Sequence, residues 1–384
     1  MGLLKSIFGK KDDNSFEISV DIEPTSSKAT NPPIGNASKA KFHLKGYPDA
    51  NGLYPSELVM LSVAERYKTT QTDFPGYLTY SYEITNPRKM LKTLNDRGYI
   101  EPGSAIDTLS IYKVSELKEI ASKAGISVKG KKADILSQLS EAGEDAITEF
   151  IKERKWKLTE SGKAEIKANP YISYFLDKHE YDLGTVGIDL WTVNKELTEN
   201  PKQLYRDVIF RLLNLLQFNT AVSIQTNPNG GSADTHTYCE CFRLMGLFVE
   251  EEGRSYVTAA DYYFQYLYKR INIHAGLQLL TRYKLYKQYK DLRSDGFDEF
   301  QQFYDDIHLY PFNRTEILRL IDECELSEDE VRDALITSFK RAKDSGIMSE
   351  EEAADFIILE LSGEVDKSKE FAVNSARRAV KKIR

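Results

Sequence analysis

The spacing of apolar residues between positions 55 and 100 predicts two short helices with an extended segment between them. A proline near the first turn introduces each helical run, at residues 55–64 and at residues 87–96. Apolar and polar residues alternate over residues 78–84, which is the period of a strand or extended segment. Gly98 is placed to end the second helix, because glycine accepts a positive φ without strain.

A second pattern of two halves occupies residues 112–139. In the first half, apolar residues recur at helical spacing until Gly125, which is expected to stop the helix. Gly130 then precedes a second run, with Ile135, Leu136 and Leu139 on one face. Two short helices joined in this way can share one small core.

From Tyr171 onward the chain is expected to be mostly helical and rich in aromatic residues. Residues 208–218 are apolar on most sides, which predicts a buried helix. The many tyrosines between positions 256 and 290 are interpreted as helix packing with a hydroxyl at the edge, in preference to a surface for base stacking. The predicted fold class is mainly α with a minor β component.

The length of 384 residues indicates more than one hydrophobic core. Residues 1–40 are polar and proline-rich, and we expect a disordered tether there. We expect an α+β domain over residues 41–170, with the two-helix module inserted at 108–142. Residues 171–384 would form a helical region, with a possible division near 310–326.

Charge and cysteine content restrict the functions that are possible. The formal net charge is −7, so any binding to nucleic acid must come from a local basic face. Three cysteines do not form a disulfide framework, which favours a reducing, cytoplasmic setting. No apolar run approaches the ~20 residues of a membrane helix, and the start of the chain is too short in apolar residues for a secretory signal.

Such a basic face is predicted within the two-helix module. Residues 112–140 hold six lysines against three acidic residues, a local charge of +3. Lys131 and Lys132 begin the second helix, where the helix dipole makes cations unfavourable. Unpaired backbone N–H groups also gather at a helix start, so two lysines there can form a site for a phosphate oxygen.

The module resembles the SAP family in four features: Leu117-Lys118, Gly125-Ile126, Gly130-Lys131-Lys132 and a closing Leu139. That family is a helix-extended loop-helix module best known for DNA binding. The resemblance implies weak contacts to the DNA backbone, with little reading of sequence. One departure is Gln138, at a position where the family often has arginine. The implied contact residues are Lys118, Lys129, Gly130, Lys131 and Lys132.

The flanks of the module resemble a winged helix. Residues 90–100 look like a recognition helix and its exit, and residues 155–162 look like the returning wing strand. The module would then be inserted between the two wing strands, a nesting expected in bacterial and phage-borne proteins by resemblance. The ordinary alternative is an α+β core with solvated surface charges. Basic residues that would meet DNA on this helix are Arg88, Lys89, Lys92 and Arg97.

The sequence predicts no catalytic residue, metal or cofactor. Asp234, His236, Cys239 and Cys241 are ligand types, but they lack the paired C-x-x-C spacing of a zinc site, so buried thiols are the expectation. No phosphate loop, nucleophile elbow or dinucleotide fingerprint is present.

Three functional hypotheses follow. The first is a DNA-associated protein that is not an enzyme, cytoplasmic and at the nucleoid, whose helical C-terminal half binds a protein partner or a second copy. The second is a protein-interaction adaptor that does not bind DNA. The third is a hidden enzyme, which would show converging ionisable side chains in a pocket of the C-terminal half.

Overall fold

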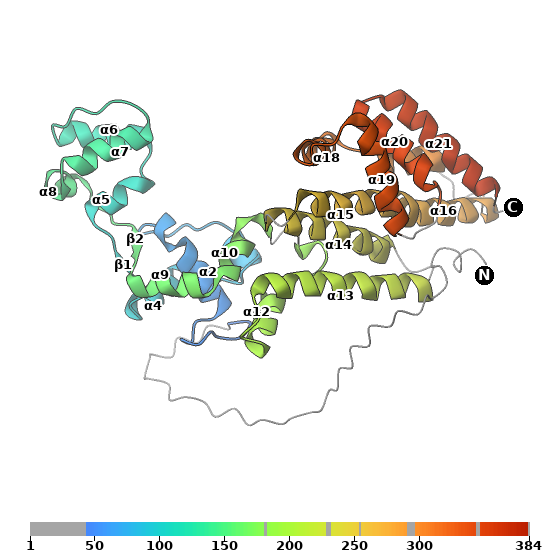
Figure 1. Ribbon diagram of the computed structural model, residues 1–384. Coiled ribbons are helices and arrows are strands. Elements are labelled where there is room, and N and C mark those ends of the chain that lie inside the picture. Colours follow the sequence, from blue (N-terminus) through green and yellow to red (C-terminus); the bar gives the residue numbers. More distant parts are fainter. Residues whose placement is uncertain are drawn as a thin grey trace, which may run out of the picture. The chain divides into compact units, whose positions relative to one another are not determined.

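A computed structural model describes residues 44–179, 183–227, 232–252, 255–289, 296–342 and 346–382 (Figure 1). The predicted tether at 1–40 lies outside these residues. The chain divides into two compact units, one ending at Ile209 and the other beginning at Phe210, within helix α13. Over the described residues the chain is mainly helical with one two-stranded sheet, so the predicted fold class is confirmed.

The N-terminal unit is built around the two predicted helices, now α2 and α4. Every residue of α2 except Ser62 is buried, because other elements surround the helix. Asn86 caps α4 by accepting a hydrogen bond from the Lys89 amide, and Gly98 follows its end with φ of +78°. The bounds are α2 Pro55–Val63, the 3₁₀ turn η1 Ala64–Arg66, α3 Tyr77–Tyr80 and α4 Pro87–Asp96.

The prediction of a strand or extended segment at 78–84 is wrong for its first part, because residues 78–80 belong to the helical turn α3, and no strand forms over the rest of the segment. In a strand, Leu78, Tyr80 and Tyr82 would share one face. Instead, Leu78 and Tyr82 are buried, whereas Tyr80 is 88% exposed. The spacing of four between the two buried residues fits a helical turn equally well, and tertiary burial decides between the two periods.

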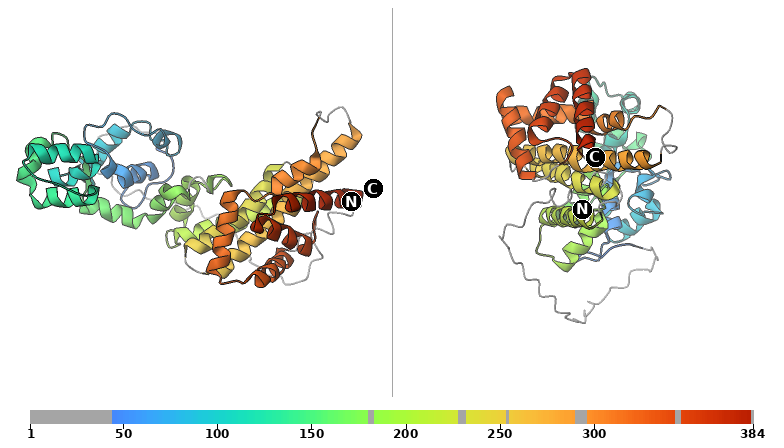
Figure 2. Two further views of the ribbon diagram at one scale, coloured as in Figure 1. Left: turned by 90° about the horizontal axis from the view of Figure 1, so that it is seen from above. Right: turned by 90° about the vertical axis from the view of Figure 1, so that its right-hand side faces the viewer.

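Two short antiparallel strands enclose the two-helix module in the sequence. Ile100 pairs with Leu158, and Pro102 pairs with Trp156. The chain between the strands forms a separate group of short helices beyond the β1–β2 pair (Figures 1 and 2). The bounds are β1 Ile100–Pro102, α5 Ala105–Thr108, η2 Leu109–Ile111, α6 Val114–Lys123, α7 Lys132–Glu141, α8 Glu144–Ile147, η3 Thr148–Phe150 and β2 Trp156–Leu158.

The N-terminal unit continues past residue 170, the end of the α+β domain expected from the sequence. Pro170 begins helix α10 instead of ending the domain, as proline is tolerated in a first turn. Tyr171 and Asn194 are buried, and the Asn194 amide holds both backbone groups of Tyr47. The remaining bounds are α9 Glu160–Ala168, α10 Pro170–Tyr174, the π-helical η4 Phe175–His179 and α12 Leu190–Glu199.

The C-terminal unit is a helical assembly around an aromatic and aliphatic core. Tyr263, Tyr266 and Tyr268 are buried there, and the Tyr268 ring stacks on Phe339 at 4.7 Å between centroids. The bounds are α13 Tyr205–Thr226, α14 Ser232–Glu251, α15 Tyr256–Lys269, the π-helical η5 Arg270–Ala275, α16 Gly276–Gln288, α17 Glu299–Ile307, α18 Pro311–Glu323, α19 Glu328–Ala342, α20 Glu350–Ser362 and α21 Val365–Lys381.

The possible division near 310–326 coincides with α18, and Ile317 of this helix belongs to the main core of the unit. The prediction that residues 208–218 are buried on most sides is wrong in part. Val208 and Leu213 are buried, but Leu215 and Phe218 are 50% and 62% exposed, because they face away from the packed side of α13.

Among the described residues, no helix has the length and apolar character needed to cross a membrane.

Candidate nucleic-acid interface

The module has a hydrophobic core of its own. Leu117 and Ile120 of α6 meet Ile135 and Leu139 of α7 in a buried cluster. Gly125 ends α6 with φ of +71°, and the next amide bonds back to the helix. This local core fixes the angle between the two helices. The other buried members are Ala105, Leu109, Ala121, Ile147 and Ile151.

Polar contacts close the base of the module over the paired strands. The Gly103 amide donates to the carbonyl oxygen of Lys155 at 2.8 Å. The Glu144 carboxylate accepts from the amides of Ala105 and Ile106, which begin α5. A carboxylate at a helix start satisfies unpaired N–H groups and complements the helix dipole. The module is therefore fastened at both of its ends.

The start of α7 combines free amides with its own carboxylate. Asp134 accepts a hydrogen bond from the Lys131 amide at 2.7 Å. Gly130 has φ of +103°, and a Cβ there would lie 2.4 Å from Asp134 Oδ2, so only glycine fits. Within the described part of the chain, the amides of Lys132 and Ala133 have no hydrogen-bond acceptor. These two amides can accept an anionic oxygen as partner.

The lysines predicted to contact DNA differ in how they are engaged. Lys118, Lys129 and Lys131 are exposed, and their ammonium groups have no ion-pair or hydrogen-bond partner among the described residues. Lys132 is partly buried, and its Nζ donates to the carbonyl oxygen of Ser110 at 2.8 Å. Four of the predicted contact residues are consecutive at the start of α7, at positions 129–132. The fifth, Lys118, lies on α6.

Two participants in this corner were not identified from the sequence. Ser110 lies 22 residues from Lys132, and only the folded chain brings them together. Gln138, noted in the sequence only as a missing arginine, binds the backbone of Lys129 through its side-chain amide. An amide with both a donor and an acceptor, nearly two turns after the start of the second predicted helix, was the available signal.

The basic residues of α4 belong to another part of the N-terminal unit. Arg88, Lys89 and Lys92 are exposed on the side opposite the buried Met90 and Leu94. None of the core residues of the two-helix module comes from this helix. The fold therefore supports α4 and the module by separate cores.

Arg97, the fourth basic residue of this region, uses its side chain for contacts within the N-terminal unit. Its guanidinium lies 3.0 Å from Glu57 Oε1 and also donates to the carbonyl oxygens of Asn51 and Gly52. Burial raises the pKa of Glu57, and the positive charge of Arg97 opposes that shift. A side chain held in this way is not available to DNA.

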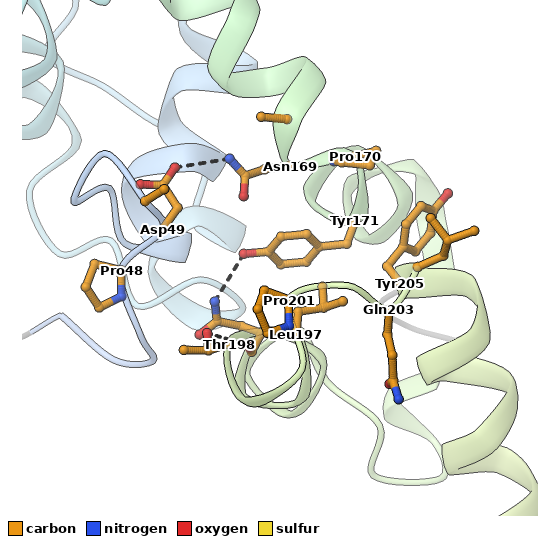
Figure 3. Close-up of a pocket in the computed structure, with 14 residues that line it drawn as sticks. Pro48, Asp49, Asn169, Pro170, Tyr171, Leu197, Thr198, Pro201, Gln203 and Tyr205 are labelled. Carbon is orange, nitrogen blue, oxygen red and sulfur yellow. Dashed lines mark hydrogen bonds between the residues drawn. The ribbon is translucent and has the colours of Figure 1, made fainter. Parts of the chain in front are cut away.

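A cavity of about 510 Å³ in the N-terminal unit lies between α12 and the α9–α10 junction (Figure 3). At its wall, Asn169 donates to Asp49 at 3.1 Å, and Asn194 donates to the Tyr171 hydroxyl at 3.2 Å. Burial raises the pKa of Tyr171 to about 12, so this phenol stays protonated. Most of the other lining residues are apolar or amides, and Asp49 is the one carboxylate among them.

In the Cys and His segment of α14, the two cysteines are buried in the C-terminal unit, whereas His236 is exposed and Asp234 is half-buried. Cys239 and Cys241 are both buried, and burial raises the pKa of the Cys241 thiol to about 12. A thiol of that pKa is a poor nucleophile and a poor ligand. No group of three or more potential metal ligands occurs among the described residues. A cavity of about 270 Å³ in this unit is lined by Ser362 and aliphatic side chains.

Comparison with known proteins does not assign this chain to a family. No protein-family model, no curated protein and no solved structure matches the chain.

Proposed function

We propose that the two-helix module binds the phosphate backbone of duplex DNA, weakly and with little dependence on base sequence. The observation that carries this proposal is the pair of exposed ammonium groups of Lys129 and Lys131, next to the amides of Lys132 and Ala133, all without a partner in the part of the chain that the structure describes. Ammonium groups and backbone N–H groups are the usual partners of phosphate oxygens. Lys118 would add a further contact from α6.

The expected affinity follows from the number of charges. Three lysines neutralise few phosphates, so binding should fall in the non-specific range, roughly 10⁻⁴ to 10⁻⁶ M at physiological salt. The net charge of −7 acts against DNA at longer range. Binding is therefore expected at low salt and should weaken steeply as salt is added.

A charge-reversal experiment tests the proposal. Lys129→Glu/Lys131→Glu should abolish the retardation of duplex DNA in a low-salt gel. Lys132 is left in place, because its bond to Ser110 supports the fold. The control Lys340→Glu/Lys369→Glu changes the net charge equally on two exposed lysines of the C-terminal unit, and should retard DNA nearly as the parent does. Equal retardation by parent and module variant would contradict the proposal.

A second candidate function is protein association through α13. Leu215, Phe218 and Val222 lie at helical spacing on one face and are 50%, 62% and 40% exposed. A run of large exposed apolar residues on one face is typical of an interaction surface. The opposite face is used within the unit, since Ile224 belongs to the main core.

The first partner to test for this face is a second copy of the chain. Sedimentation velocity should show a concentration-dependent dimer for the parent and a monomer for Leu215→Glu/Phe218→Glu. Thr281→Glu/Thr337→Glu, at exposed polar positions of α16 and α19 in the same unit, is the control and should still dimerise. A parent that stays monomeric up to high concentration would exclude self-association.

A further inference from the structure

The side chain of Gln138 holds the loop that carries the candidate phosphate contacts. Its Oε1 accepts from the Lys129 amide at 3.1 Å, and its Nε2 donates to the Lys129 carbonyl oxygen at 2.9 Å. Nε2 also donates to the carbonyl oxygen of Asp134 at 2.9 Å. A side-chain amide offers one acceptor and two donors, and all three are used here.

These contacts imitate the pairing of two residues in a β-ladder. In an antiparallel sheet, two opposed residues exchange both of their backbone hydrogen bonds. Lys129 exchanges both of its bonds with one side chain, so its backbone is fixed in position and direction relative to α7. The opposite side of the loop is held by Ile126 and Val128, which pack on the module core.

Apart from the packing of Ile126 and Val128, the loop is weakly held. It has no helix or strand between Gly125 and Lys131, and Gly130 is free of the conformational restraint of a side chain. The Asp134 carboxylate fixes the amide of Lys131, next to the helix. Without the Gln138 contacts, the backbone of Lys129 would be restrained only through its two neighbours, Val128 on the module core and flexible Gly130 before α7.

We propose that Gln138 is a positioning residue for DNA binding, which presents Lys129 beside the start of α7 so that Lys129 and Lys131 engage phosphates together. This inference rests on the proposed function of the module. Fixing a loop in its bound arrangement removes part of the ordering cost of association, so the gain appears as affinity without a new contact. Gln138 itself touches no phosphate.

The experiment replaces Gln138 in the full chain by Met, which is similar in length but has neither donor nor acceptor. Duplex affinity should fall about 3- to 10-fold, and the slope of log K against log salt should decrease by up to about 0.9, the equivalent of one phosphate contact. Amide exchange at Lys129 should accelerate. Ser137→Ala, on the neighbouring exposed position of α7, should leave all three measurements unchanged.

Two further measurements keep the result interpretable. Exchange of the Ile120 and Ala121 amides reports whether the module of Gln138→Met is still folded. Gln138→Glu keeps the acceptor for the Lys129 amide but loses both donated bonds, and should give intermediate protection at Lys129. Its added charge affects DNA directly, so this variant is evaluated by exchange alone.

Each outcome has one meaning. Faster exchange at Lys129 together with weaker binding and a smaller salt slope supports the positioning role. Faster exchange with parent-like affinity and slope means a purely structural contact and overturns it, as does unchanged exchange at Lys129. Absence of duplex binding by the parent itself, at low salt, overturns the proposed function as well as this inference.

Discussion

The ammonium group of Lys132 lies 2.8 Å from the carbonyl oxygen of Ser110. This contact ties the start of α7 to the 3₁₀ turn η2, 22 residues earlier in the chain. A cation at a helix start is unfavourable toward the helix dipole, and a carbonyl acceptor offsets that cost. Of the two adjacent lysines, one therefore supports the module and the other, Lys131, presents its charge to solvent.

We predict that Lys132→Met mainly lowers stability, whereas Lys131→Met mainly weakens DNA binding. Lys132→Met should lower the free energy of unfolding by about 1 kcal/mol, the net value of a lost hydrogen bond. Lys131→Met should leave stability nearly unchanged and weaken duplex binding more. Urea unfolding and fluorescence anisotropy measure the two quantities. Equal losses of affinity in both variants would show that Lys132 also contacts DNA.

Asp134→Asn should strengthen duplex binding by about 2- to 3-fold at low salt. The Asp134 carboxylate accepts from the Lys131 amide and places a negative charge where a phosphate is expected. Asparagine can still accept that hydrogen bond, and it removes the repulsion. Loss of the charge at the helix start should cost roughly 0.3–1 kcal/mol of stability. Weaker binding by this variant, measured by anisotropy, would contradict the placement of the phosphate.

In the C-terminal unit, burial lowers the pKa of His274 to about 4, with His236 at 5.6 Å between ring centroids as a second cause. Thr235 Oγ1 lies 2.9 Å from His274 Nδ1, and Gln278 Nε2 lies 3.0 Å from its Nε2. The charges of Asp306 and Glu240 raise the pKa, and Arg270 lowers it further. The folded chain therefore holds this imidazole neutral at neutral pH.

The pH dependence of stability follows from that shift. An unfolded histidine titrates near 6.5, so the stability from neutral His274 is complete above that pH and is lost as pH falls toward 4. His274→Gln should remove about 1 kcal/mol of the loss between pH 7 and pH 5, a figure reduced because the ring is partly exposed. Thermal melts across this range compare it with the parent. Parallel profiles would contradict the assignment.

Glu165→Gln should raise the melting temperature at pH 7.5 by about 2 °C. Burial raises the pKa of Glu165, and the nearby Asp49 carboxylate adds to the shift. Its Oε2 is buried without a hydrogen-bond partner among the described residues, and the ionised form becomes costly as pH rises through the raised pKa. Glutamine keeps the contact of Oε1 with Asn51 and supplies a donor. Glu160→Gln, exposed on the same helix, should give no such gain; a lower melting temperature for Glu165→Gln would contradict this account.

The sequence predicts the helices of the module because their signals are local. Apolar spacing, Gly125 and Gly130 lie within the segment that they organise. The contacts of Lys132 with Ser110 and of Gln138 with Lys129 depend on how the turn η2 and the loop before α7 fold against α7. The spacing of apolar residues does not reveal that arrangement. The lysines could therefore be located from sequence, but their division into supporting and exposed residues could not.

The two wrong expectations have one physical cause. A hydrophobic pattern states which residues can be buried, and neighbouring elements decide which of them are. Leu78 and Tyr82 fit both a strand and a helical turn, and their burial selects the turn. Leu215 and Phe218 fit a helix buried all round, but no described element covers them fully.

The most direct test of the account is the salt dependence of duplex binding by the full chain. Anisotropy with a labelled duplex should give a log–log slope for the parent that decreases by about 1.8 in Lys129→Gln/Lys131→Gln, since each lost phosphate contact contributes about 0.9. Lys340→Gln/Lys369→Gln should keep the parental slope. Identical slopes for the parent and the module variant would contradict the claim that this module binds the DNA backbone. Absence of binding by the parent at low salt would contradict it as well.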